Sequence, residues 1–228
     1  MQEDKYKYLE NTENNKTKNY YIKKNKEAEI YLKKINQKKL DNMINDAIRI
    51  NFRTLPIETE NATFWEEFDV KNNGSSKVYI KYKNEKEKVL IDPNKIQKEE
   101  FSSFYVSEQG NITAYLTEQE GFETYNIYLI DSNGKEIEEK LNDVYGFLTW
   151  NSDETGFYYN KKTFIAGDKR DYSSFKFEIY FHKLKTNQKQ DIKLLTNKEK
   201  EFDNDTFTDM SISDNSKYII IQNNPKDY

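Results

Sequence analysis

The segment 107–129 begins with the turn Ser107-Glu108-Gln109-Gly110, continues into the short aromatic strand Ala114-Tyr115-Leu116 and reaches a second strand at Ile127-Tyr128-Leu129. A polar turn followed by two short runs of aromatic and β-branched residues is typical of paired antiparallel strands. The segment therefore predicts a β-hairpin.

The same unit occurs twice more along the chain. The second copy begins at Asn151-Ser152-Asp153 and contains Gly156-Phe157-Tyr158-Tyr159 and Ile179-Tyr180-Phe181, and the third begins at Ser213-Asp214-Asn215-Ser216 and contains Tyr218-Ile219-Ile220-Ile221. The three turns begin 44 and 62 residues apart. Repeats of four short antiparallel strands every 40–60 residues, roughly, are typical of propeller blades. The chain is therefore predicted to be mainly β, a partial β-propeller of four-stranded antiparallel blades whose last blade stops in its middle.

Composition and charge narrow the possible functions. The 228 residues include 18 Tyr and 14 Phe but only 7 Gly and 3 Pro, which suits pleated, half-buried surfaces. Lys and Arg (36) nearly balance Asp and Glu (40), so the net charge of −4 provides no broad basic field for nucleic acid. The absence of cysteine excludes disulfides and thiolate chemistry and favours a reducing compartment.

The N-terminus gives no sign of a membrane or export signal. Met1-Gln2-Glu3-Asp4-Lys5 lacks an apolar region, and no stretch approaches the ~18 consecutive apolar residues of a membrane span. We expect a soluble cytoplasmic protein that has no membrane partner.

The first part of the chain follows a helical pattern. Ala28, Tyr31, Leu32 and Ile35 fall on one helical stripe, and Leu40, Met43, Ile44, Ala47 and Ile48 form a second. After Pro56 the period becomes two, as in Val78, Ile80 and Tyr82. We therefore predict an N-terminal helical segment over residues 1–60 and a partial propeller of about three and a half blades over 61–228. The stretch from Lys161 to Asp171 is predicted to be a longer loop between strands.

Lysines accompany the helical stripes at Lys33, Lys34, Lys38 and Lys39. They are compatible with a basic-helix nucleic-acid binder or a phosphate- or membrane-binding face. Glu27 and Glu29 dilute the positive charge, so a solvated helix face is the favoured interpretation.

Residues for catalysis or metal binding do not form a recognisable set. No Gly-x-Ser-x-Gly motif is present, and His182 is the only histidine and lies in an alternating strand pattern that favours a structural role. The acidic run from Asp203 to Asp209 lacks the glycine and the glutamate of a calcium-binding loop. We predict no catalytic residue, no metal site and no cofactor.

Several ordered segments resemble the prolyl oligopeptidase family of serine peptidases. The matching segments are Tyr8-Leu9-Glu10, Asn25, Tyr31-Leu32, Val89-Leu90-Ile91-Asp92-Pro93-Asn94, Ser107–Gly110, Trp150-Asn151-Ser152-Asp153, Gly156-Phe157-Tyr158-Tyr159 and Ile179-Tyr180-Phe181-His182-Lys183-Leu184. Tyr8 replaces the tryptophan usual in the family, and the first-blade region from Phe64 to Lys88 is short. The shared order of these segments over most of the chain makes the resemblance specific.

The resemblance implies that substrate access and catalysis are carried out by different domains. In this family the propeller restricts access to short peptides, the N-terminal helices pack on an α/β-hydrolase domain, and that later domain holds the catalytic Ser, Asp and His. None of that domain is expected in these 228 residues. Tyr145, between Val144 and Gly146, falls where the family's propeller offers an aromatic residue to the substrate cavity. A tyrosine that only packs within its strand is the favoured interpretation of this residue.

Two functions of different classes follow. The favoured one is the N-terminal and propeller portion of a prolyl oligopeptidase-like serine peptidase acting on short proline-containing peptides, with a gating role and without peptidase activity of its own. A separate C-terminal hydrolase-domain polypeptide is its expected partner. The alternative is a non-catalytic propeller-type module that binds a peptide or protein.

Overall fold

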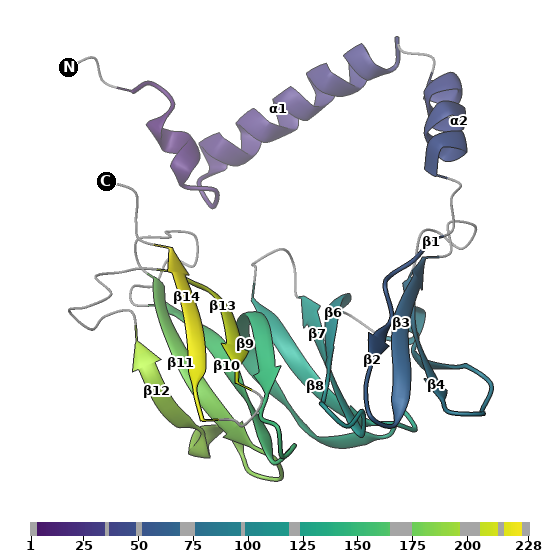
Figure 1. The fold of residues 1–228 in the computed structure, drawn as a ribbon. Helices are drawn as coiled ribbons and strands as arrows, with labels where there is room; N and C mark the ends of the chain where they lie inside the picture. Colours follow the sequence, from purple (N-terminus) through teal and green to yellow (C-terminus); the bar gives the residue numbers. More distant parts are fainter. Residues whose placement is uncertain are drawn as a thin grey trace. The chain divides into compact units, whose positions relative to one another are not determined.

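The structure is a computed structural model that describes residues 4–34, 37–48, 52–68, 76–96, 99–118, 124–164, 175–196, 206–213 and 217–224. The chain divides into two compact units, Met1–Ile50 and Asn51–Tyr228. Figure 1 shows helices in the first unit and antiparallel strands in the second.

The first unit contains a short 3₁₀ helix, η1 (Lys7–Glu10), followed by α1 (Asn15–Leu32) and α2 (Gln37–Ile48). Helix α1 begins after Asn14, whose side chain accepts a hydrogen bond from the backbone N–H of Lys16 and so satisfies one free donor at the helix start. The buried Thr17 hydroxyl donates to the carbonyl of Tyr8 at 2.7 Å and ties η1 to α1. The helical prediction for this region is confirmed; Ile35 of the predicted stripe lies outside the described residues.

The second unit begins with a five-stranded sheet that we call blade 1. It consists of β1 (Phe52–Arg53), β2 (Ile57–Glu58), β3 (Ala62–Phe68), β4 (Ser76–Tyr82) and β5 (Lys88–Ile91). Both β1 and β2 pair with β3, so blade 1 has the order β1/β2-β3-β4-β5. Sheet structure therefore starts at Phe52, ahead of the boundary expected near residue 60.

A seven-stranded sheet follows, built from two blades that share one strand. Its strands are β6 (Glu100–Val106), β7 (Ile112–Glu118), β8 (Tyr125–Asp131), β9 (Glu136–Trp150), β10 (Gly156–Phe164), β11 (Phe175–Lys183) and β12 (Ile192–Thr196). The first part of β9 pairs with β8 and its last part pairs with β10, while Val144 is opposite residues of both. We call β6–β8 with residues 136–144 blade 2, and residues 144–150 with β10–β12 blade 3.

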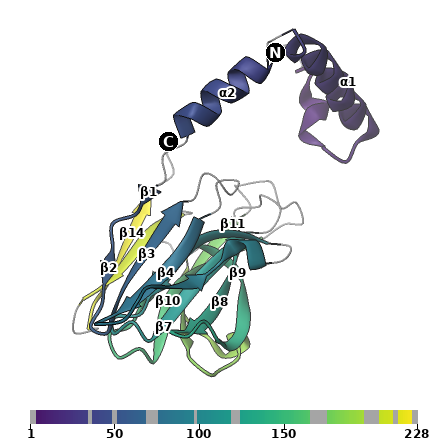
Figure 2. The same ribbon diagram turned by 90° about the vertical axis from the view of Figure 1, so that its right-hand side faces the viewer.

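The last sheet, blade 4, contains only β13 (Thr206–Ile212) and β14 (Ile219–Asn224) among the described residues. Figure 1 shows blades 1, 2 and 3 following one another, with β13 and β14 drawn over blade 3 in this view, and Figure 2, turned by 90°, brings β2, β3 and β4 to the front. Every described strand pair is antiparallel. The predicted mainly β fold, a partial propeller preceded by helices, is confirmed.

The three repeated turns share one hydrogen-bond pattern. In each, the first residue donates its backbone N–H to the carbonyl five residues later, at 2.9 Å for Ser107, 3.1 Å for Asn151 and 2.9 Å for Ser213. In return, its side-chain oxygen accepts the N–H of that later residue, at 3.0, 2.9 and 3.0 Å respectively. A serine or asparagine is needed because its short side chain reaches back to the backbone of its own turn.

The turns of neighbouring blades also contact one another. The backbone N–H of Asn61 in blade 1 donates to the carbonyl of Gln109 in blade 2 at 3.3 Å. The Glu154 carboxylate of blade 3 accepts from the Gln109 N–H at 2.8 Å and from the Asn111 side-chain amide at 2.9 Å. These contacts align the first three blades along one rim.

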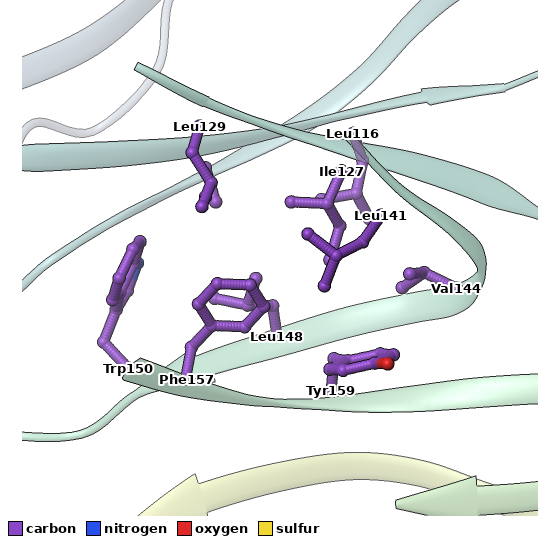
Figure 3. Packing of buried hydrophobic residues seen from close by; sticks show 10 residues of the cluster. Leu116, Ile127, Leu129, Leu141, Val144, Leu148, Trp150, Phe157 and Tyr159 are labelled. Carbon is purple, nitrogen blue, oxygen red and sulfur yellow. The ribbon is translucent and has the colours of Figure 1, made fainter. Parts of the chain in front are cut away.

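The largest buried cluster lies between blades 2 and 3 (Figure 3). It comprises Ala114, Leu116, Ile127, Leu129, Leu141, Val144, Leu148, Trp150, Phe157 and Tyr159. Trp150 packs edge-on against Phe157 with ring centroids 5.1 Å apart, and its indole N–H donates to the carbonyl of Tyr105 at 3.1 Å. Because the shared strand supplies residues to this cluster, burial of apolar surface binds the two blades together.

The predicted loop from Lys161 to Asp171 is partly wrong. Residues 161–164 continue β10 and pair with residues 175–178 of β11, whereas residues 165–171 lie outside the described part of the chain. Lys162, which the prediction placed in this loop, is only 2% exposed, and its ammonium lies 5.0 Å from the ring centroid of Tyr145. Contact with an aromatic face allows this charge to be buried in a strand.

Candidate functional site

Tyr145, the residue singled out from the sequence, lies where β9 passes from blade 2 to blade 3. On either side of it the backbone adopts left-handed conformations, with φ of 59° at Asp143 and 73° at Gly146. Such conformations are uncommon for residues other than glycine and mark a sharp local change in strand direction. The bend therefore fixes the direction of the Tyr145 side chain relative to both blades.

The Tyr145 ring is half-buried and makes defined contacts. Its centroid lies 4.9 Å from that of Phe177 on β11, and the Lys162 ammonium from β10 lies 5.0 Å from it on one side. Phe177 belongs to a cluster with Phe147, Ile179 and Met210, which joins blade 3 to β13. The tyrosine thus has a packing role, and its ring remains partly exposed.

His182 lies on β11 and is buried, since only 1% of it is exposed. Its Nδ1 lies 2.8 Å from Oδ1 of Asp191, and the other oxygen of Asp191 accepts the Tyr159 hydroxyl at 2.8 Å. Burial and this hydrogen bond to an acid raise the pKa of Tyr159 far above its ordinary value. The histidine is engaged in a buried network, which supports the structural interpretation made from the sequence.

A buried polar centre in blade 2 was not predicted from the sequence. The Glu99 carboxylate, 7% exposed, accepts hydrogen bonds from Thr117, from the Asn126 amide at 3.1 Å and from the Tyr128 hydroxyl at 3.0 Å. The Lys140 ammonium lies 3.2 Å away. These partners come from β7, β8 and β9, so one carboxylate ties three strands of blade 2 together.

Electrostatics around Glu99 follow from burial and charge. Burial, and then the hydrogen bond to Glu99, raise the pKa of Tyr128. Burial opposes the charged form of Lys140, but the hydrogen bond to Glu99 prevails and raises the pKa of its ammonium. No sequence pattern reveals this centre, because Glu99 meets partners 18–41 residues away along the chain.

Within the described ranges, no group of three His, Asp or Glu side chains could hold a metal ion. Residues 203–205 of the acidic run considered above lie outside those ranges. In the same part of the chain, no helix is both long enough and apolar enough to span a bilayer.

Comparison with known proteins agrees with this architecture. The model of the family described as "Prolyl oligopeptidase, N-terminal beta-propeller domain" matches residues 2–225. A prolyl endopeptidase of Elizabethkingia meningoseptica is 26% identical over 197 residues, which cover 82% of this chain and 27% of that protein. One of Elizabethkingia miricola is 31% identical over 129 residues, covering 53% and 18%. The chain thus matches about a quarter or less of the length of these curated relatives.

Solved structures show the same fold at low sequence identity. A structure from a study of two prolyl endopeptidases aligns with a TM-score of 0.83 at 19% identity, covering 96% of this chain and 33% of that one. Oligopeptidase B from Leishmania major aligns with a TM-score of 0.76 at 14% identity, covering 98% and 32%. With blades that repeat one turn and a family model that matches nearly every residue, the chain belongs to the prolyl oligopeptidase family and corresponds to its N-terminal β-propeller domain.

Proposed function

We propose that this chain is the N-terminal and propeller portion of a prolyl oligopeptidase-like serine peptidase that acts on short proline-containing peptides. The observation that carries the proposal is the match of the family's propeller model to residues 2–225. In this proposal the chain admits or excludes peptides, while a hydrolase domain outside these 228 residues supplies the nucleophile, the acid and the base.

A gating role requires that neighbouring blades do not separate spontaneously. Blades 2 and 3 share β9, bury a common core and are joined at their rim through Glu154. A continuous strand together with a shared apolar core resists separation, because opening the seam would expose buried side chains to water. These contacts support a propeller wall that limits substrates by size.

In this proposal the N-terminal helices also contact the hydrolase domain. Their apolar side chains stand exposed in the first unit, among them Tyr31 (68%), Leu32 (53%) and Met43 (61%). Apolar side chains grouped on one part of a helix are suited to docking against another protein surface.

Tyr145 is the proposed contact with substrate inside the propeller. Its ring is half-exposed and held by Phe177 and Lys162, so it can present a fixed aromatic face to a peptide. In the assembled enzyme we expect Tyr145→Phe to keep the packing and change the KM for peptide little, and Tyr145→Ala to raise KM several-fold. If Tyr145→Ala lowers thermal stability and leaves KM unchanged, the residue has only a packing role.

The catalytic part of the proposal is tested with the purified 228-residue chain and a fluorogenic peptide that contains proline. We expect no turnover, because one buried histidine and no Gly-x-Ser-x-Gly motif cannot form a Ser-His-Asp triad. Turnover that a serine-directed inhibitor blocks would overturn this assignment.

A peptide-binding module without a catalytic partner is the second candidate. A cavity of about 490 Å³ between blades 1 and 2 favours it, since Leu90, Ile96, Tyr115 and Tyr128 give it apolar and aromatic walls. This candidate predicts a monodisperse monomer that binds peptides and does not associate with any hydrolase domain.

A further inference from the structure

A second cavity, of about 500 Å³, lies between blades 2 and 3 at the end of the unit where β11 turns towards β12. One side is formed by Lys140, Leu141 and Asn142 of β9, and the other by residues 185–189 of the β11–β12 turn, with His182 also in the lining. The cavity is therefore composed of residues from both blades.

The side-chain amide of Gln188 joins the two sides. The Gln188 side chain donates to the carbonyl of Asn142 at 2.9 Å and accepts the Asn142 backbone N–H at 3.1 Å, as a neighbouring strand would. The same Gln188 nitrogen lies 3.3 Å from the Tyr159 hydroxyl. This arrangement fixes the distance between the blades at the cavity.

Asp191, which contacts His182 of the cavity lining, has further partners in the protein. Asp191 accepts from Tyr159 and lies 2.8 Å from His182 Nδ1, and its side chain is 1% exposed. It is not part of the lining. Asp191 is thus hydrogen-bonded within the buried network beside the cavity.

The lining itself is basic and polar. It contains three lysines, Lys140, Lys185 and Lys189, together with Asn142, Thr186, Asn187 and Gln188, and it contains no acidic residue. Glu99 partly neutralises Lys140 at 3.2 Å, and the other two lysines lie on the β11–β12 turn. Ammonium groups that share one cavity repel each other, and a bound anion would relieve that repulsion.

The turn that carries two of these lysines is well defined locally. Lys185 adopts φ of 63°, the Thr186 hydroxyl donates to the carbonyl of Lys183 at 2.6 Å, and the Asn187 side chain accepts from the N–H of Lys189. These bonds hold the backbone of the turn, which reduces the entropy that a ligand would have to remove.

We propose that this cavity binds a small oxyanion, with inorganic phosphate as its simplest form, and that the anion bridges Lys140 of blade 2 to Lys185 and Lys189 of blade 3. Lysine ammonium groups bind phosphate oxygens as point charges, and the surrounding amides and hydroxyl supply additional hydrogen-bond donors. The proposal does not depend on the proposed peptidase function. Its consequence is that the anion stabilises the seam between the two blades.

The test uses the 228-residue chain at a concentration below any self-association, titrated with phosphate against potassium chloride at equal ionic strength and pH. Because binding to the folded state alone raises its stability, we expect phosphate at about ten times its Kd to raise Tm by about 3–5 °C. The chain has a single histidine, so NMR gives a second readout: the imidazole signals of His182 are expected to shift with the same saturation curve.

The variant Lys185→Gln/Lys189→Gln is expected to lose both responses. The matched control Lys81→Gln/Lys83→Gln removes the same charge from exposed positions of blade 1 and should keep them. Pyrophosphate and AMP are run in parallel: tighter binding of either would identify a diphosphate or a nucleotide phosphate as the preferred source of the oxyanion. Equal stabilisation of both variants, or of the chain by chloride, would overturn the proposal.

Discussion

Glu178 shows how a single charged side chain can stabilise a strand pair from inside the protein. The carboxylate, on β11, lies 2.7 Å from the Lys176 ammonium and 3.3 Å from that of Lys193 on β12, and it accepts the Tyr180 hydroxyl at 3.1 Å. Burial opposes the charged form, but the two lysines and Tyr180 prevail and hold the pKa of Glu178 below its ordinary value.

This lowered pKa predicts a pH-dependent stability. A carboxyl group whose pKa is lower in the folded than in the unfolded state stabilises the protein above the unfolded pKa, and this contribution disappears as pH falls through the folded pKa. We expect Glu178→Gln to lose about 1–3 kcal/mol at neutral pH. The difference from the wild type, measured by urea unfolding, should shrink below about pH 4.5. An unchanged difference at acid pH would contradict this account, and the exposed Glu100→Gln serves as control.

Substitutions at two glycines distinguish the cost of steric crowding from the cost of backbone strain. A Cβ added at Gly156 would lie 2.3 Å from the carbonyl oxygen of His182, whereas one at Gly146 would meet nothing within 4 Å but would have to accept φ of 73°. We expect Gly146→Ala to cost about 1–2 kcal/mol from the left-handed conformation alone. Gly156→Ala should cost more, because β10 and β11 would have to move apart. Equal Tm values for the two variants would contradict this prediction, because they would show that β10 and β11 can move apart without a loss of stability.

At the scale of structural elements, the repeated turn is the unit that builds the blades. Ser107→Ala removes the side-chain acceptor of the Ile112 N–H at a fully buried position, and we expect a loss of about 1–2 kcal/mol. Ser213→Ala removes the same bond to Tyr218, but water can reach this more exposed turn, so the loss should be smaller. Chemical denaturation of both variants checks this order, and a larger loss for Ser213→Ala would refute it.

These turns also explain why so much of the fold was predictable. A serine or asparagine that bonds its own turn leaves a local signature, so positions 107, 151 and 213 could be recognised from neighbouring residues alone. Strands β1 and β2 contain two residues each and are exposed. No alternation of apolar and polar residues therefore indicated that the first sheet begins at Phe52.

Other features depend on contacts distant in sequence. The partners of Glu99 lie on three strands, and the burial of Lys162 depends on a ring from another strand. The sharing of β9 by two blades likewise follows from pairing with β8 and β10, which a pattern of period two does not reveal. For the candidate site, the sequence singled out Tyr145 through family resemblance, whereas its contacts with Phe177 and Lys162 required the fold.

At the scale of the whole molecule, each unit has apolar surface available for a partner. In the second unit, β14 has only β13 as its described neighbour, and Tyr218 and Ile220 are 70% and 65% exposed. In the first unit, Ile30 and Met43 are exposed to 62% and 61%. An unpaired strand edge and exposed apolar side chains favour association with another polypeptide.

We therefore expect the isolated chain to bind a hydrophobic dye such as ANS and to self-associate as its concentration rises. A separately expressed C-terminal hydrolase-domain polypeptide should suppress both effects by covering these surfaces. Light scattering and dye fluorescence, with and without that polypeptide, provide the measurement. A monodisperse monomer with a cooperative thermal transition and no dye binding would instead favour the peptide-binding module.

The most direct test of the central claim is reconstitution of a gated peptidase. The chain is mixed with a prolyl oligopeptidase hydrolase domain from the same organism, and hydrolysis of a short proline-containing peptide is compared with that of a long unfolded protein carrying the same cleavage sequence. Our account predicts a stable complex in which cleavage of the long substrate falls relative to that of the short peptide. A hydrolase domain that does not bind the chain would contradict the account. So would one whose relative cleavage of long and short substrates is the same with and without the chain.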